Sequence, residues 1–436
     1  MRLASARRWS VARRAGIVAV CAVIAAVALI VAPSRGPAST VRVLDTLARL
    51  EGAALDAFLT AHPDKLLELT NADAKRFRSG WYALPASERR GLERVIPAFV
   101  GNADGLPYAL RDRANRRQLA TELASAEHDV RSHPGDRGAA VRASSYVAIR
   151  NALRSSGGVR RYLVEFIPNA QPTAAISVGD PDTADVVTWA VPGMGTYTTD
   201  MQLWTLAAQN IWNAQGEAGA SKDRSVIAWM GYAAPPVGID AALGDYAANG
   251  APLLIEAIRG LSAARFGRVP TLNVVAHSYG TTMAADALAD ADLGVTAFVM
   301  LGSAGIEERI PTAGDLHARA VYAAEAASDT EARLGRASRF DPRAPGFGAR
   351  VLPADGDAKT GLLPVTGHAP ILHSSWNDDI TSTAWTRIAP ERVRAALYRD
   401  HMAQHGYLDA GTQSLAEVAV ATTVPPLSVL YTVAAK

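Results

Sequence analysis

Segment 271–285 has the residue spacing that most directly suggests chemistry. Ser278 lies at the centre of Ala276-His277-Ser278-Tyr279-Gly280, a G-x-S-x-G pattern with alanine in place of the first glycine. Small residues two positions before and after the serine permit a sharp turn that lifts its hydroxyl above a sheet edge. A β-branched apolar run precedes the turn, and small residues suited to a packed helix follow it. The pattern predicts a serine nucleophile; an ordinary serine in a strand-to-helix turn is the alternative.

Such a nucleophile needs hydrogen-bond donors for the oxyanion that forms on the substrate. Residues 185–191 are predicted to form a strand, which ends in the glycine-rich turn PGMGT at 192–196. Open α/β sheets bind ligands outside the carboxyl edge, where this turn would lie. The backbone N–H of Met194 or Gly195, together with that of Tyr279, is therefore predicted to form the oxyanion hole; a plain glycine turn is the alternative.

The nucleophile also needs a base and an acid that orients the base. In hydrolases with a G-x-S-x-G turn, the serine comes first along the chain, then the acid and then the histidine. Both partners are therefore expected after Ser278. Asp329 comes just after the predicted strand 318–325 and is the predicted acid. The weaker alternatives for the acid are Glu325, Asp315 and Asp341.

The base is expected to be a histidine, because only histidine titrates near neutral pH without perturbation. His368 follows the last predicted strand, 349–352, at about the loop length expected for the base. His405 directly precedes the final turn and helix, and His373 is the third alternative. The base stays open among these residues, in the order His368, His405, His373.

Strands and helices alternate from about residue 146 onward, which is typical of a mainly parallel, doubly wound sheet covered on both faces. Before that point, apolar residues recur at helical spacing and prolines divide the chain into short helices. The predicted organisation is a targeting segment and linker at 1–40, an α-helical region at 41–140 and an α/β domain at 141–436. Besides the strand before Ser278, predicted strands cover 162–167, 174–178, 185–191, 225–230, 296–301, 318–325 and 349–352, and predicted helices include 247–261, 390–404 and 413–421.

Charge and motifs exclude several classes of function. The net charge of +2 is small, and much of the excess lies in the first fourteen residues, so no nucleic-acid partner is expected. The sequence has no C-x-x-C or H-E-x-x-H pattern, and its glycine-rich turn lacks the third glycine of a dinucleotide fingerprint. No metal and no cofactor are predicted.

Residues 15–32 form an apolar run without charges, and five arginines precede it. This pattern predicts an uncleaved signal-anchor that contacts the membrane, with a cleaved signal peptide as the alternative. The positive-inside rule places the bulk of the chain outside the cytoplasm. The protein is therefore expected to lie in the cell envelope, anchored in the membrane with its catalytic domain outside the cytoplasm, or to be secreted.

Three passages resemble the actinobacterial α/β-hydrolases catalogued as domain of unknown function 1023. They are the helical stretch at 81–115, the turns at 191–196 and 276–280, and the stretch GYLDAGTQSL at 406–415. The resemblance implies an α/β-hydrolase fold, Ser278 as nucleophile and an envelope or secreted location. Family members tend to have the histidine shortly before the aromatic turn. Here a long segment separates His368 from Tyr407, so the position of the base stays open.

The resulting expectation is a serine hydrolase that cleaves a carboxylic ester, either a lipid or an acylated envelope component, through a Ser-His-Asp triad. A peptidase or thioesterase is the alternative among enzymes. A non-catalytic envelope-binding module with the same fold is the alternative from another class. The oligomeric state is not predicted.

Overall fold

The structure is a computed structural model. It describes residues 37–50, 52–62, 65, 69, 74–154, 158–238, 244–336, 339–374 and 391–423. The predicted signal-anchor at 15–32 lies outside these residues. Within them, no helix is both long enough and apolar enough to cross a membrane.

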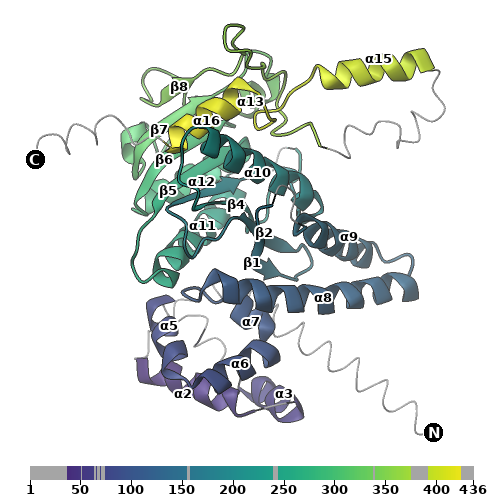
Figure 1. Ribbon diagram of the computed structural model, residues 1–436, viewed down its shortest axis with the longest axis vertical. Helices are drawn as coiled ribbons and strands as arrows, with labels where there is room; N and C mark the ends of the chain where they lie inside the picture. The colour runs from purple at the N-terminus through teal and green to yellow at the C-terminus, as the bar shows by residue number, and fades with distance from the viewer. Residues whose placement is uncertain are drawn as a thin grey trace, which may run out of the picture. The chain divides into compact units, whose positions relative to one another are not determined.

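Eight strands form one sheet in the order β1-β2-β4-β3-β5-β6-β7-β8 (Figure 1). Their bounds are β1 (Arg161–Ile167), β2 (Thr173–Val178), β3 (Val186–Val191), β4 (Arg224–Met230), β5 (Thr271–His277), β6 (Val295–Leu301), β7 (Ala318–Ala324) and β8 (Arg350–Leu352). The pairs from β4-β3 through to β7-β8 are all parallel. Parallel strands end at the same edge, so the loops after β3, β5, β6, β7 and β8 gather there.

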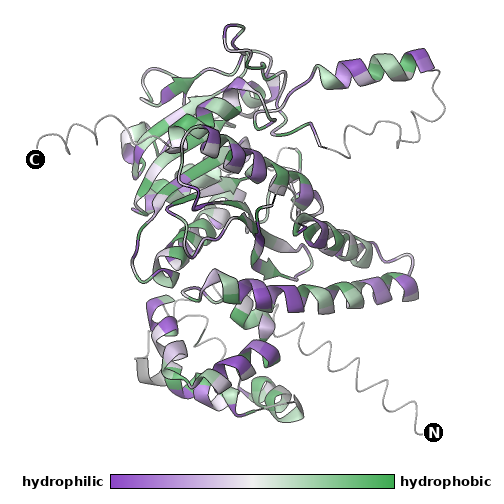
Figure 2. Cartoon of the chain, viewed as in Figure 1, coloured by the Kyte–Doolittle hydropathy of each residue, from purple (hydrophilic) through white to green (hydrophobic). Residues whose placement is uncertain are grey.

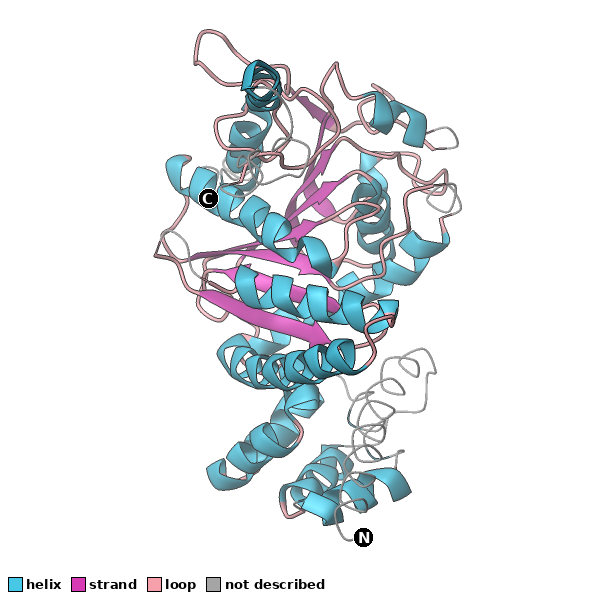
Figure 3. Ribbon diagram, turned by 90° about the vertical axis from the view of Figure 1, so that its right-hand side faces the viewer, coloured by secondary structure: helices cyan, strands magenta, loops and turns pink. Residues whose placement is uncertain are grey.

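The central strands of the sheet are buried on both faces, which explains their continuous apolar runs. All six residues of β3 and all seven of β4 are buried. Figure 2 shows hydrophobic colouring along the strands of the sheet, and Figure 3 shows helices on both sides of the sheet. The α/β fold class predicted from the sequence is confirmed.

The chain divides into two compact units, of which the first comprises residues 1–150, 162–175 and 256–268. Its helices are α2 (Pro37–Ala48), α3 (Gly52–Ala61), α5 (Ala74–Ala83), α6 (Ala86–Val95), α7 (Pro97–Asn102), α8 (Tyr108–Ser132) and most of α9 (Arg137–Ala152). Their apolar faces share one core, which includes Leu44, Leu47, Phe77, Trp81, Leu92, Val100 and Leu106. Short helices are stable here because this burial offsets their low intrinsic stability.

Within this unit, polar side chains from the helices satisfy the backbone of edge strand β1. Asn102 bonds both the N–H and the C=O of Phe166, each at 2.8 Å. Asp112 accepts from the N–H of Leu163 at 2.8 Å, and Asn115 donates to its C=O at 3.0 Å. An uncovered edge would be open to pairing with another chain. The helical stretch that carries part of the family resemblance thus has a structural role at the sheet edge.

The second unit comprises residues 151–161, 176–255 and 269–436. It contains α10 (Met201–Glu217), α12 (Tyr279–Asp290), α13 (Thr330–Gly335), α15 (Glu391–Met402), α16 (Gln413–Thr423) and the start of α11 (Asp245–Ala264). Helix α12 packs on β5, and α16 packs on β6 and α10. Short 3-10 turns lie at Thr198–Asp200 and Ala313–Asp315.

The strands whose bounds were predicted are all present, and the bounds differ by at most one residue. Helices α9 and α10 were not predicted. The predicted helix 390–404 begins and ends within that range, at Glu391–Met402. Each compact unit is built from three separate segments of the sequence, so no single position divides one unit from the other. The predicted domain boundaries near residues 40 and 140 stay predictions.

Candidate active site

Ser278 occupies a strained turn between the end of β5 at His277 and the start of α12 at Tyr279. Its backbone has φ 54° and ψ −129°, and it is one of two non-glycine residues with positive φ in the described chain. Such a conformation costs free energy and persists only where the surrounding structure enforces it. The side chain is thereby presented at the carboxyl edge of the sheet, as the sequence pattern predicts.

Two glycines allow the turn after β3 to lie directly against the serine turn. A Cβ atom on Gly193 would lie 2.6 Å from the Cβ of Ser278, and one on Gly280 would lie 2.4 Å from the carbonyl oxygen of Pro192. Both distances are too short for any side chain. Glycine is therefore required at both positions for the two turns to meet.

Ser278, His368 and Asp329 form a continuous hydrogen-bond chain. The Nε2 atom of His368 lies 2.8 Å from the Oγ of Ser278, and its Nδ1 lies 2.9 Å from Oδ2 and 3.0 Å from Oδ1 of Asp329. The carboxylate accepts at Nδ1, so Nδ1 carries a proton and the neutral ring presents a lone pair at Nε2 to the serine hydroxyl. This arrangement can remove the serine proton and return it later.

Asp329 is held as a carboxylate by three donors. Burial raises the pKa of Asp329, but the hydrogen bonds from His368, the Ala332 N–H and the Tyr407 hydroxyl outweigh this effect and lower it to about 2. The Ala332 N–H lies 2.9 Å from Oδ1, and the Tyr407 hydroxyl lies 2.7 Å from Oδ2. Asp329 also caps the N-terminus of α13, which fixes its backbone.

His277 is hydrogen-bonded to the backbone of His368. Its Nε2 lies 2.7 Å from the carbonyl oxygen of His368 and therefore donates to it. Burial, together with the nearby His368 ring, lowers the pKa of His277 to about 3. The ring is consequently neutral at physiological pH, and its role is to position His368 rather than to exchange protons.

Of the predicted oxyanion donors, the structure leaves two available. The Gly195 N–H donates to the carbonyl oxygen of Pro235 at 2.8 Å, so the prediction of Gly195 as a donor is corrected. The N–H groups of Met194 and Tyr279 make no hydrogen bond within the described part of the chain. Met194 directly follows Gly193, which touches Ser278, and Tyr279 is the first residue of α12. These two amides can serve a negatively charged oxygen beside the serine.

The other predicted candidates lie away from the serine hydroxyl. His405 bonds Thr366 through its backbone, and its ring lies 5.1 Å from that of His373. Neither histidine is hydrogen-bonded to Ser278, so the structure brings His368 to the serine and does not bring His405. Asp315 caps its own 3-10 turn by accepting from Thr312.

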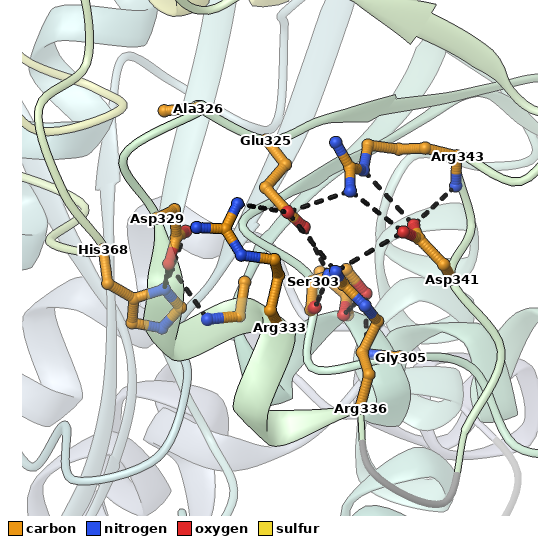
Figure 4. Close-up of polar contacts among 12 residues, drawn as sticks. Ser303, Gly305, Glu325, Ala326, Asp329, Arg333, Arg336, Asp341, Arg343 and His368 are labelled. Carbon is orange, nitrogen blue, oxygen red and sulfur yellow. Dashed lines mark hydrogen bonds and ion pairs between the residues drawn. The ribbon is translucent and has the colours of Figure 1, made fainter.

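Glu325 and Asp341, the remaining acid candidates, belong to an arginine cluster beside Asp329 (Figure 4). Glu325 bonds Arg336 and pairs with Arg343 at 2.9 Å and Arg333 at 3.9 Å. Its side chain is only 1% exposed, so these pairs compensate a buried charge. The cluster also fixes neighbouring backbone, because Arg336 donates to the carbonyl of Ser303 at 3.1 Å.

Comparison with known proteins agrees with this fold. A family model described as alpha/beta hydrolase matches residues 168–338. The uncharacterized protein Rv2079 of Mycobacterium tuberculosis is 29% identical over 286 residues, which cover 59% of this chain and 43% of that protein. The match thus spans less than half the length of this curated relative.

Among solved structures, the dienelactone hydrolase from Anabaena variabilis is similar at 12% identity and a TM-score of 0.29, over 42% of this chain and 80% of that one. A fungal esterase from Rhizomucor miehei is similar at 14% identity and a TM-score of 0.32, over 65% of this chain and 96% of that one. The resemblance inferred from the sequence holds at the level of the alpha/beta hydrolases; the narrower family and its actinobacterial restriction stay predictions. The chain has the alpha/beta-hydrolase fold, and its residues 168–338 match the alpha/beta hydrolase family model.

Proposed function

We propose that this protein is a serine hydrolase that cleaves a carboxylic ester, with Ser278 as nucleophile, His368 as general base and Asp329 as the acid that orients the base. The observation that carries the proposal is the hydrogen-bond chain from the serine hydroxyl through both ring nitrogens of His368 to a carboxylate. No cofactor takes part in the proposed reaction.

In the proposed mechanism, His368 Nε2 removes the hydroxyl proton as Ser278 Oγ attacks the ester carbonyl carbon. The carbonyl oxygen becomes an oxyanion and accepts hydrogen bonds from the N–H groups of Met194 and Tyr279. His368 then gives its proton to the departing alkoxide, which leaves an acyl group on Ser278. Water attacks this acyl-enzyme with His368 again as base, and the carboxylic acid leaves as the serine hydroxyl is restored.

The proposed substrate is a carboxylic ester of the cell envelope. An ester is proposed rather than an amide because an alkoxide is a better leaving group than the anion of an amine. Its departure therefore depends less on proton donation by His368. A lipid or acylated component of the cell envelope is proposed, since the N-terminal sequence predicts a signal-anchor or secretion. The envelope location is part of the proposal on the same ground.

The test is labelling of the full chain with a fluorophosphonate probe, together with hydrolysis of a p-nitrophenyl ester series. Ser278→Ala and His368→Ala are expected to lower ester turnover by at least about 10³-fold and to abolish or greatly slow labelling. Ser132→Ala and His317→Ala are matched controls, because both side chains are exposed and neither takes part in the hydrogen bonds of the triad. They should behave as wild type.

Two outcomes would overturn the proposal at different levels. A folded wild-type protein that neither labels nor turns over esters would favour the non-catalytic binding module. Labelling that depends on Ser278, combined with cleavage of anilides or thioesters but not of esters, would retain the nucleophile and replace the substrate class.

A further inference from the structure

His373 and His405, which are not at the serine, meet in a second cluster together with Asp409. One ligand atom from each of the three residues, an imidazole nitrogen or a carboxylate oxygen, lies within 4.8 Å of the others. The ring of His401, at the end of α15, lies 5.1 Å from that of His373. The cluster lies in the second compact unit and joins segments more than thirty residues apart.

The proton on His373 can be assigned from its neighbour. Its Nε2 lies 2.6 Å from the carbonyl oxygen of Gln404, and a carbonyl oxygen only accepts hydrogen bonds. Nε2 is therefore the donor, and in the neutral ring Nδ1 carries the lone pair. Metal-binding histidines commonly use one nitrogen as ligand while the other donates to a backbone carbonyl in this way.

His405 supplies a second, independent observation. Its Nδ1 atom is buried and has no hydrogen-bond partner among the described residues. An imidazole nitrogen withdrawn from water without a partner costs free energy. A cation bound between His373 and His405 would supply that partner. It would also account for two imidazole rings lying next to a buried carboxylate.

Backbone hydrogen bonds fix the carboxylate of Asp409, the third candidate metal ligand, in place. It is 1% exposed, and its carboxylate accepts from the N–H groups of Leu372, His373 and Gly406 at 2.6 to 3.1 Å. These three N–H groups make four contacts, two on each carboxylate oxygen, because the Leu372 N–H is shared between both. A cation would share these oxygens with the backbone donors. The negative charge of Asp409 would partly neutralise a divalent ion held by two neutral imidazoles.

We propose that His373, His405 and Asp409 form a binding site for a divalent transition-metal ion of the zinc type, with His401 as a fourth ligand. Two or three imidazole nitrogens with one carboxylate oxygen suit zinc, whereas calcium and magnesium prefer oxygen ligands alone. Ligand atoms around tetrahedral zinc lie about 3.3 Å apart. The side chains would therefore move slightly closer together on binding.

The site has a structural role in this proposal. His373 follows His368 in the same loop, and Asp409 lies two residues after Tyr407, which bonds Asp329. A metal ion would hold these two segments together from outside the triad. The inference does not depend on the proposed esterase activity, because it concerns binding and stability.

The experiment measures zinc binding to the full chain, purified without a histidine tag and stripped of metal, by calorimetric titration and elemental analysis. Wild type is expected to bind one zinc ion with a dissociation constant of about 1 µM or tighter, and its Tm should rise with added zinc. His373→Ala and His405→Ala should weaken binding at least about tenfold and remove the zinc-dependent rise in Tm. His317→Ala, which alters an exposed histidine outside the cluster, should bind zinc as wild type does.

Cobalt(II) gives a second readout that needs no variant. Its visible absorption in wild type should have the intensity typical of four-coordinate geometry and should disappear when zinc is added. Absence of saturable zinc binding by folded wild type would overturn the proposal. Unchanged affinity in a folded His373→Ala/His405→Ala double variant would also overturn it. Where these variants do not fold, the cobalt spectrum of wild type decides the question.

Discussion

The Tyr407 hydroxyl and the His368 ring donate to the same oxygen of Asp329, and only the ring touches Ser278. The Tyr407 hydroxyl lies 2.7 Å from Oδ2 of Asp329 and accepts from the Ala326 N–H at 3.0 Å. Burial and the charge of Asp329 raise the pKa of Tyr407, so it remains a protonated donor. In the proposed mechanism Tyr407 is therefore a positioning residue, whose hydrogen bond shares the charge of Asp329 and fixes its orientation toward His368.

Tyr407→Phe is expected to lower kcat/KM for an ester about tenfold or more, mainly through kcat, because a hydrogen bond to a charged group is lost away from the substrate. Removing this donor also leaves more negative charge facing His368. The acidic limb of the pH profile of kcat/KM should consequently move to higher pH.

Tyr146→Phe is the matched control, since the buried Tyr146 hydroxyl has no hydrogen-bond partner among the described residues. It should leave both kcat and the pH profile unchanged. A Tyr407→Phe variant that loses only thermal stability, with the acidic limb in place, would show a purely structural role.

Single residues differed in how well the sequence predicted them. Ser278 and Asp329 follow recognisable strands, and His368 follows β8 at the expected loop length, so position alone suggested them. Tyr407 and His277 were not identified as positioning residues. Their partners Asp329 and His368 lie 78 and 91 residues away in the chain, and no local pattern encodes such contacts.

At the scale of elements, the loops that follow β6 and β7 are joined by the Glu325 arginine cluster. Arg336 connects Glu325, just after β7, to the carbonyl of Ser303, just after β6. Arg333 donates to the carbonyl of Ala327, within the loop that ends in Asp329. The cluster (Figure 4) thus holds the acid loop against the loop beside the serine turn.

Glu325→Gln keeps the shape of this side chain and removes its charge. The variant is expected to lower the free energy of unfolding by about 3 kcal/mol, because the buried guanidinium of Arg336 loses its main partner. Chemical denaturation at neutral pH measures the change. Glu308→Gln, at an exposed position, is the control and should lie within about 0.5 kcal/mol of wild type. An equally small effect of Glu325→Gln would mean that Asp341 alone balances these arginines.

The strands were predicted accurately because each is a short, buried, β-branched run bounded by turn residues. Helix α10 was not predicted, although its buried residues include Trp204, Ala208 and Ile211 at helical spacing. The arginine cluster was also missed. Glu325 and Asp341 lie sixteen positions apart, and their neighbours resemble any charged surface until the fold buries Glu325.

At the scale of the whole molecule, groups buried in the candidate active site link stability to pH. The pKa of His277 is lowered from 6.5 to about 3 in the folded chain, so between these values the unfolded chain binds a proton that the folded chain does not. Stability therefore decreases as the pH falls through this window. Asp329 acts in the same direction at lower pH: its contribution is complete above its unfolded pKa of 3.8 and is lost as the pH falls toward about 2.

His277→Gln separates the first contribution from the rest of the protein. Glutamine can still donate to the His368 carbonyl, but it does not titrate. In wild type, His277 should contribute a slope of about 1.4 kcal/mol per pH unit to the free energy of unfolding between pH 6 and pH 4. Urea denaturation at pH 7, 6, 5 and 4 should show that the free energy of unfolding depends less steeply on pH in His277→Gln, by that amount.

His317→Gln, at an exposed histidine, should retain the wild-type slope. Equal slopes for all three proteins would mean that His277 becomes protonated in the folded state, and its hydrogen bond to His368 would then need another explanation.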